Sequence, residues 1–346
     1  MAAKPFVTIL CIGLLVLSII PSLATADDHL IFDNKGHTWP PTGDNLILAF
    51  HSLQPGTELW IPAGNFTISN ANLCITQDDI QIHGSGPGTL IYLTDGSRFI
   101  TGRNANATDD NIRYQRGINN LLLEDFQISG YGNIEIVLGN NTQLRYIQAY
   151  DIYAASKPRS AAIRFILPTS CSYCTNLEVF NCHTNRTFNH GFQINGVKPN
   201  GTNTLTNVRF DFCSASFAGW RYPGRPDGWN WSTGFDLGEG YNHCLMNEPR
   251  ILVRFCTADH NWESGFHIES NVKKKLTYLR CEADDNGQKR IYYPDSTAFF
   301  ASGFIAEIGI RLICCKANNN TNKGVLCRDI CVIILMKGTG NWNGLY

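Results

Sequence analysis

Residues 251–269 read ILVRFCTADHNWESGFHIE, and this stretch contains two short apolar alternations separated by a polar turn. Ile251 and Val253 lie two residues apart before the turn, and Phe266 and Ile268 lie two apart after it. Residues two apart on a β-strand point to the same face of the sheet. The stretch therefore predicts strand, turn and strand, each strand with one buried face.

The first half of this pattern occurs five times, each time around one cysteine. The segments are LEVFNCHTN, VRFDFCSAS, ILVRFCTAD, LTYLRCEAD and IRLICCKAN, with anchors Cys182, Cys213, Cys256, Cys281 and Cys315. Apolar residues lie three and five positions before every anchor, and HGFQIN, TGFDLG, SGFHIE and SGFIAE follow four of them. Strands recurring in this order, with Asn261, Asn286 and Asn320 in matching turns, predict a β-solenoid whose asparagines stack and hydrogen-bond.

The spacing of the anchors argues against another repeat fold. Successive anchors are 31, 43, 25 and 34 residues apart. A β-propeller needs regular blades of about forty residues. Short coils that carry loop insertions of different lengths fit these distances better.

The start of the chain adds a cap to this solenoid. Residues 43–56, GDNLILAFHSLQPG, predict a short amphipathic helix, and TELWIPAGNFTIS and DDIQIHGSGPGTLIYL predict the first strands. This order resembles the opening of the pectin-lyase-like, right-handed parallel β-helix superfamily, and the resemblance covers about residues 30–335. It implies an all-β, single-stranded right-handed parallel β-helix whose N-terminal helix covers the open end and its unpaired backbone groups.

The resemblance implies a class of activities and no single reaction. The superfamily includes lyases, hydrolases, epimerases and proteins without known chemistry. Its polygalacturonases carry Asn-x-Asp, Asp-Asp and Gly-His-Gly motifs. Here an Asp-Asp pair occurs at Asp284 and Asp285, but Asn-x-Asp appears in no matching upstream coil, and the histidine of Asn189-His190-Gly191 lacks the preceding glycine. No catalytic residues can therefore be carried over from one enzyme family.

Residues 1–26 have the features of a secretory signal peptide: a basic residue, about fifteen apolar residues and an Ala-x-Ala end. We expect cleavage after Ala26 and one β-helix domain over residues 27–346. The formal net charge of −1 becomes −2 when Lys4 is removed, which does not suggest nucleic-acid binding. No later stretch is long enough for a transmembrane span.

An exported protein can form disulfides and carry N-glycans. Twelve of the thirteen cysteines remain after the loss of Cys11. We expect the five anchor cysteines to stack inward as small apolar residues, and Cys171 and Cys174 to form a local disulfide or plain thiols. Sequons begin at Asn65, Asn106, Asn140, Asn185, Asn200, Asn230 and Asn319.

The distance from each anchor to the next Gly-Phe pair predicts a cleft. It is 9 residues from Cys182, 21 from Cys213, 9 from Cys256 and 22 from Cys281. Loop insertions at about 217–232 and 286–301 would thus flank the rung of Cys256 alone on both sides. Aromatic faces suit sugar rings and basic side chains suit carboxylates. The expected substrate-binding residues are Trp220, Arg221, Tyr222, Arg225, Trp229, Trp231, Asp236, Trp262, Lys289, Arg290, Tyr292 and Tyr293.

Acidic residues and histidines concentrate on the floor of this cleft. The candidate catalytic residues are Asp259, His260, Asp284, His267 and Glu269. Asp259, Asp284 and Asp285 form a candidate cation site, for which calcium is the expected ion. The outward column of the second strand carries Gln193, Asp236 and His267. These residues could equally form a solvated polar face of the solenoid.

The leading functional hypothesis is a secreted or cell-surface β-helix that binds, and processes, an acidic extracellular polysaccharide. A hydrolase would need a carboxylic acid and a carboxylate, and a lyase or epimerase would need a base and a cation beside the uronate carboxylate. The rival hypothesis is a non-catalytic surface, adhesion or structural protein. The last coil carries no clear polar cap, so its end could dock onto another chain.

Overall fold

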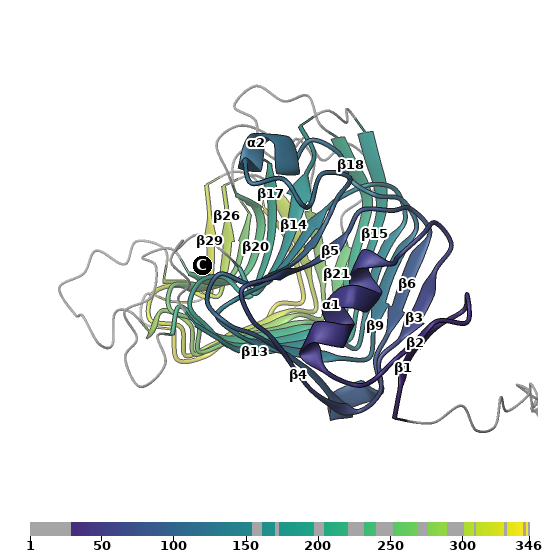
Figure 1. The fold of residues 1–346 in the computed structure, drawn as a ribbon. Helices are drawn as coiled ribbons and strands as arrows, with labels where there is room; N and C mark the ends of the chain where they lie inside the picture. Colours follow the sequence, from purple (N-terminus) through teal and green to yellow (C-terminus); the bar gives the residue numbers. More distant parts are fainter. Residues whose placement is uncertain are drawn as a thin grey trace, which may run out of the picture.

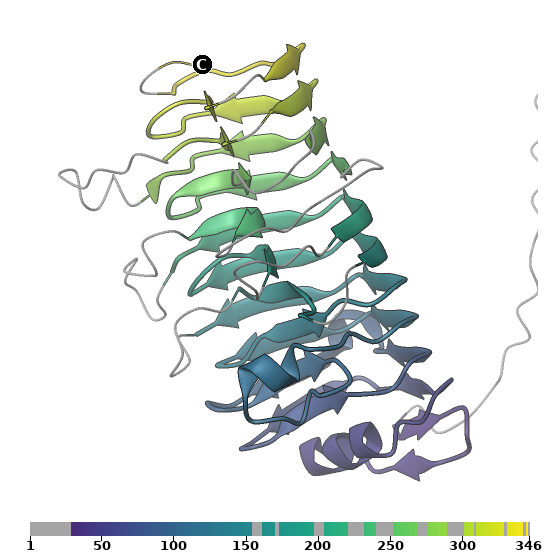
Figure 2. The ribbon, with the colours of Figure 1, turned by 90° about the horizontal axis from the view of Figure 1, so that it is seen from above.

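The chain forms a parallel β-helix, seen here in a computed structural model. The structure describes residues 29–153, 161–169, 173–196, 204–220, 232–239, 252–268, 276–288, 301–307, 309–328, 331–341 and 344 of the 346. Each coil contributes one strand to each of three sheets, and the coils stack along one axis (Figures 1 and 2). Viewed from the N-terminal end, the chain turns clockwise as it recedes, so the helix is right-handed (Figure 1).

The first sheet begins with a short antiparallel pair, β1 and β2, and is parallel from β3 onward. Its order is β2 (Thr38–Trp39), β1 (Ile31–Asp33), β3 (Glu58–Trp60), β6 (Ile80–His83), β9 (Leu121–Glu124), β12 (Thr142–Arg145), β15 (Tyr173–Phe180), β18 (Thr204–Asp211), β21 (Leu252–Arg254), β24 (Leu276–Leu279), β27 (Ile310–Ile313) and β30 (Val332–Ile334).

The second sheet follows the first in each coil and is entirely parallel. In chain order it contains β4 (Gly64–Ile68), β7 (Thr89–Leu93), β10 (Gln127–Gly130), β13 (Gln148–Ile152), β16 (His183–Thr187), β19 (Ser214–Ala218), β22 (Thr257–Asp259), β25 (Glu282–Asp284) and β28 (Lys316–Asn318).

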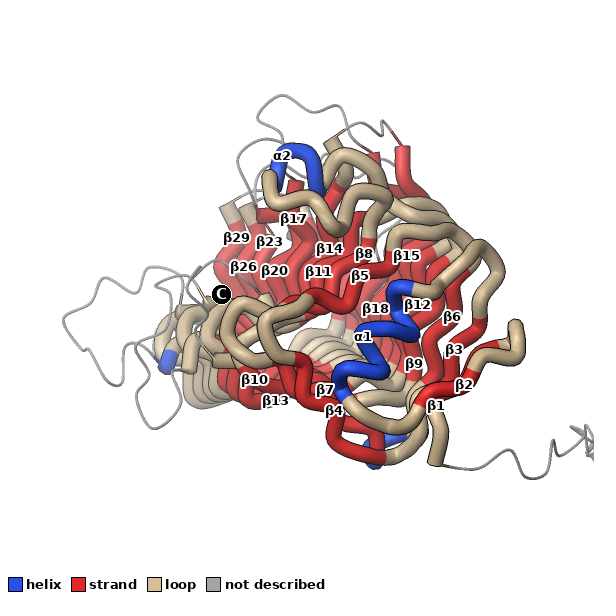
Figure 3. The backbone as a smooth tube through the Cα atoms, viewed as in Figure 1, coloured by secondary structure: helices blue, strands red, loops and turns tan. Residues whose placement is uncertain are grey.

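The third sheet completes each coil (Figure 3). Its strands are also parallel. In chain order it contains β5 (Asn72–Ile75), β8 (Arg98–Thr101), β11 (Ile134–Val137), β14 (Ile163–Leu167), β17 (Phe192–Gly196), β20 (Thr233–Glu239), β23 (Ser264–Ile268), β26 (Phe304–Ala306) and β29 (Val325–Cys327).

Helix α1 (Gly43–His51) closes the N-terminal end of the solenoid (Figure 2). The hydroxyl of Thr42 accepts a hydrogen bond from the amide of Asn45 and caps its first turn. Phe50 is buried and meets the ring of Phe99 edge-on at 5.4 Å. The helix ends at His51, five residues before the predicted end at 56, because a turn containing Pro55 follows. Shorter helical turns are η1 (Gly86–Gly88) and α2 (Asp110–Arg113).

The inward residues stack in columns, as the alternation predicted. Phe192, Phe235, Phe266 and Phe304 are fully buried, and successive rings stack at 4.9, 4.8 and 4.9 Å. The five anchor cysteines are also buried and inward, and each thiol donates to a backbone carbonyl, which confirms their expected place in the core. Burial raises the pKa of the Cys182 thiol to about 12.

The asparagine ladder between the second and third sheets is confirmed. The amide of Asn261 donates to Asn286 at 2.9 Å, and the amide of Asn286 donates to Asn320 at 3.0 Å. Asn320 donates in turn to Asn341 at 2.9 Å. Each amide nitrogen also donates to a backbone carbonyl. The ladder therefore supplies hydrogen bonds to buried backbone groups beside the turns.

Long connections join the second and third sheets in three coils, one more than predicted. They run between β13 and β14, between β19 and β20, and between β25 and β26, with short turns in the coils between. In the first of these coils Ile147 occupies the place of the anchor cysteine, and 15 residues separate it from Ala162. The rung of Cys256 is therefore not the only one with longer connections on both sides, because the rung of Cys182 shares this arrangement.

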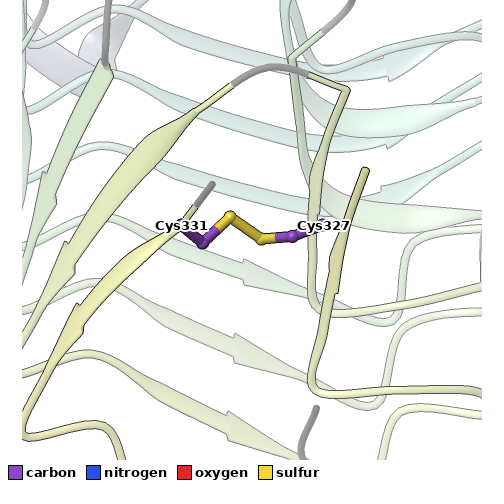
Figure 4. Close-up of a disulfide and its surroundings, with 2 residues drawn as sticks. All are labelled: Cys327 and Cys331. Carbon is purple, nitrogen blue, oxygen red and sulfur yellow. A yellow bond between two sulfur atoms is a disulfide. The ribbon is translucent and has the colours of Figure 1, made fainter. Parts of the chain in front are cut away.

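The last coil contains one disulfide. Cys327 and Cys331 are joined across the connection between β29 and β30, with Cα atoms 6.4 Å apart (Figure 4). Cys171 lies outside the described residues, so the predicted pairing of Cys171 with Cys174 stays a prediction. In the described part of the chain, no helix is long and apolar enough to cross a membrane.

Candidate functional site

The outward face of the third sheet carries a column of polar side chains in consecutive coils. The strand register aligns Glu135, Arg164, Gln193, Asp236 and His267, each one rung from the next. Their neighbours along each strand are inward apolar residues, so the column points away from the core. Yet Glu135, Gln193 and Asp236 are less than 4% exposed. Buried polar groups in such a row need partners, and the partners define the site.

Asp236 is the fourth of the five residues of this polar column and contacts residues of the coil before it. Gln193 donates to its Oδ2 at 3.3 Å, and Nε2 of His190 lies 3.7 Å from the same oxygen. The backbone amide of Thr233 donates to Nδ1 of His190 at 3.2 Å. A ring nitrogen that accepts a hydrogen bond carries no proton, so Nε2 is the ring nitrogen of His190 that can donate toward Asp236.

His267 continues the polar column into the next rung and is 9% exposed. Its Nε2 lies 3.9 Å from Oε1 of Glu307, and Arg328 donates to the same oxygen at 3.3 Å. Asp236 and His267 thus lie on neighbouring strands of the third sheet, and Glu307 directly follows the next strand, β26. His190 approaches Asp236 from the turn before β17. Carboxylate and imidazole groups in contact are the usual means of moving protons in enzymes.

The other end of the polar column is basic. Arg98 and Arg164 lie on either side of the buried carboxylate of Glu135, at 3.6 and 3.8 Å. The hydroxyl of Tyr114 donates to Glu135 at 2.9 Å. Tyr114 belongs to the segment that carries α2, and it packs with Cys74, Ile100, Ala105, Val137 and Ile166 on the outer side of the third sheet.

Three of the predicted floor residues lie instead on the second sheet. Asp259 and Asp284 are in register on neighbouring strands, as the repeat predicted. Asp259 accepts from Ser216 at 2.7 Å and lies 3.1 Å from Nδ1 of His260. The Asp259 and His260 side chains are 36% and 41% exposed, and the His260 ring stacks on Phe217 at 5.0 Å.

Asp284 is held by the following coil. Its Oδ1 accepts hydrogen bonds from the backbone amide and the side-chain amide of Asn318, at 3.0 and 2.9 Å. Burial raises the pKa of the Asp284 carboxyl above its usual range, and the two hydrogen bonds from Asn318 oppose that rise. This carboxyl therefore has a structural partner.

The predicted floor cluster is divided between two sheets. Asp259, His260 and Asp284 belong to the second sheet and its turn, whereas His267 belongs to the third. Trp262, predicted to bind substrate, is 2% exposed and packs in the turn beside Gly219. Trp220 donates from Nε1 to the carbonyl of His260 at 3.3 Å. Asp259 and His260 thus form a second polar group, which is more exposed than the polar column and is called the turn cluster below.

Among the described residues, no group of three or more histidine, cysteine, aspartate or glutamate side chains is placed to hold a metal ion. The cation site predicted at Asp259, Asp284 and Asp285 stays a prediction. Asp284 faces Asn318, and Asp285 occupies the left-handed turn position with a φ of 54°.

Ten of the predicted residues lie outside the described residues, and their roles stay predictions. They are Arg221, Tyr222, Arg225, Trp229, Trp231, Glu269, Lys289, Arg290, Tyr292 and Tyr293.

Sequence reasoning found Gln193, Asp236 and His267 but missed the basic end of the polar column. Glu135 and Arg164 occupy the second position of IEIV and IRFIL, where an outward residue is expected between two apolar ones. That alternation was the available signal. The role of Tyr114 could not be read from it, because Tyr114 reaches Glu135 from a connection outside the repeat.

No protein-family model and no curated protein sequence matches the chain. Among solved structures, it is similar to the A-module of a mannuronan C-5 epimerase from Azotobacter vinelandii. The two are 11% identical, the match covers 87% of this chain and 91% of that one, and the TM-score is 0.32. The assignment of the fold rests on the strand pairing described above.

Proposed function

We propose that the protein binds an acidic extracellular polysaccharide along the outward face of its third sheet and processes it there. The observation that carries this proposal is the polar column that runs from Glu135 through Asp236 to His267. A linear polymer can follow such a column along the solenoid axis. Ionisable groups stacked in successive coils can then meet successive parts of one chain.

The chemistry of the polar column suits a sugar that carries a carboxylate. Asp236 and His267 occupy adjacent rungs, so their backbones lie about 4.8 Å apart. One can remove a proton while the other donates one, as a lyase, an epimerase or a hydrolase requires. Arginine donors at the other end can pair with the carboxylate of another uronate of the same polymer and hold the polymer in place along the polar column.

The test is a screen of the purified protein against uronate polysaccharides. Unsaturated product near 235 nm reports a lyase, new reducing ends report a hydrolase, and proton NMR of the intact polymer reports an epimerase. We expect turnover of at least one polymer, and Asp236→Asn and His267→Gln should each reduce it about 100-fold or more. Asp259→Asn is the matched control on the second sheet and should leave turnover within about twofold.

Two outcomes would contradict this assignment. Loss of turnover in Asp259→Asn with retention in Asp236→Asn would move the chemistry to the turn cluster of Asp259 and His260. Binding without turnover of any polymer would favour the rival function, a non-catalytic surface or adhesion protein. The deep burial of Asp236 and Gln193 is the observation that favours this rival, since buried polar networks also serve to fix structure.

A further inference from the structure

The pair Arg98 and Arg164 has more positive charge than its protein partner neutralises. Two guanidinium groups lie beside the single carboxylate of Glu135, and Tyr114 is a neutral donor, because burial and the Glu135 charge raise the pKa of its hydroxyl. The local balance is therefore two positive charges against one negative charge. Such a surplus at a largely buried position is costly unless an anion completes it.

The guanidinium nitrogens of these arginines also have donors that Glu135 does not bind. The nitrogens nearest to Glu135 lie 3.6 and 3.8 Å from its oxygens, beyond hydrogen-bonding distance. Nε of Arg164 is buried and has no hydrogen-bond partner in the described part of the chain. A guanidinium has five donors arranged as a planar fork, which matches a carboxylate in a two-point contact.

Glu135 and Tyr114 hold this fork in place. The Tyr114 hydroxyl fixes Glu135 at 2.9 Å, and the guanidinium of Arg164 lies over the Tyr114 ring at 5.7 Å. Arg164 is one rung from Gln193 and two rungs from Asp236. At about 4.8 Å per rung, Arg164 lies roughly 10 Å along the axis from Asp236, and Arg98, which is four rungs from Asp236, starts roughly 19 Å away.

We propose that Arg98 and Arg164 form a carboxylate-binding subsite, which binds an acidic sugar near the one that lies over Asp236. This inference rests on the proposed function and specifies it, because it makes a uronate two to four rungs from the reacting sugar a requirement for tight binding. In the next two rungs toward the N-terminal end, the outward column continues with the buried apolar residues Ile100 and Cys74, so the subsite is the last polar one at this end.

Free galacturonate is the probe that tests the subsite without any assumption about the polymer. Saturable binding to the native state raises the melting temperature. With ionic strength matched by sodium chloride, we expect galacturonate to raise the melting temperature of the wild type, and glucose to have no such effect. Arg164→Gln and Arg98→Gln should each abolish the rise, and Arg164→Lys should restore part of it.

Arg311→Gln is the matched control, because Arg311 is exposed on the outward face of the first sheet. It should keep the full galacturonate effect. A purely structural role for Arg164 predicts a lower melting temperature in buffer but an unchanged rise with galacturonate. That result, or no rise in the wild type, would overturn the subsite.

The polymer experiment separates the subsite from the proposed catalysis. Arg164→Gln should raise the KM for an acidic polymer about 10- to 100-fold with a small change in kcat, since one charge-assisted contact is removed. Asp236→Asn should lose turnover and keep the galacturonate effect. If no polymer is processed while galacturonate binding depends on Arg164, the catalytic proposal fails and the subsite stands.

Discussion

Asp284 carries a carboxyl that is partly buried and hydrogen-bonded by the next coil. Burial raises its pKa above the ordinary value of 3.8, while Asn318 donates two hydrogen bonds to one of its oxygens. A carboxyl with a raised folded-state pKa stabilises the fold when it is protonated. That contribution is complete below the unfolded pKa and is lost as the pH rises through the folded value.

Asp284→Asn should therefore increase stability at neutral pH. The asparagine oxygen can accept both hydrogen bonds from Asn318, and it carries no charge to be desolvated. We expect a higher urea midpoint than the wild type at pH 7 and no difference at pH 3, where the wild-type carboxyl is protonated.

Asp95→Asn, at an exposed turn, serves as the control and should change neither midpoint. A lower midpoint for Asp284→Asn at pH 7 would show that the ionised form is needed.

Single residues were predictable from the sequence where the repeat dictates their surroundings. Asp236 and His267 could be placed in one outward column because each follows a phenylalanine that must point inward. Trp262 was misplaced for the opposite reason. A turn residue has no alternation to fix its direction, and in the structure Trp262 is buried and packs against Gly219.

The asparagine ladder is the element that joins the turns of successive coils. Asn286 accepts from both the backbone amide and the side chain of Asn261, and donates to Ala258 and Asn320. All three asparagines are fully buried. A second ladder, through Asn120, Asn141, Asn176 and Asn207, runs along exposed turns.

Asn286→Ala should destabilise the protein by about 2–4 kcal/mol, because it leaves buried groups in two neighbouring turns without partners. Asn141→Gly in the exposed ladder should cost less than about 1 kcal/mol, since water can replace the lost contacts and glycine accepts the left-handed backbone. Urea titrations of both variants measure the difference. Equal costs would mean that burial adds nothing to the ladder.

At the scale of elements, the spacing that predicted the loop insertions was measured only in the coils that share a cysteine. The coil of β12 and β13 carries Ile147 in the anchor position, so its long connection to β14 was missed. A buried isoleucine and a buried cysteine serve the same packing purpose. Periodicity of polarity, not identity of one residue type, is therefore the more general signal for a coil.

The whole molecule is close to a one-dimensional stack, in which each coil contacts mainly its two neighbours. Stability in such a structure is approximately a sum over coils and their interfaces, so the ends open first. Helix α1 limits the opening of the N-terminal end by burying Leu46, Ala49 and Phe50 against the first coils. The two ends should thus respond separately to substitutions.

Phe50→Ala should destabilise the N-terminal coils by about 3–5 kcal/mol, because it removes a buried ring that meets Phe99 at the end of the stack. Amide hydrogen exchange, measured separately for peptides from each coil, should become faster in β4 to β8 and remain unchanged in β21 to β24. Phe304→Ala, which removes an equally buried ring near the other end, should produce the reverse order. If either variant accelerated exchange equally in all coils, the solenoid would open as a single cooperative unit, and the cap would stabilise the whole molecule instead of its own end.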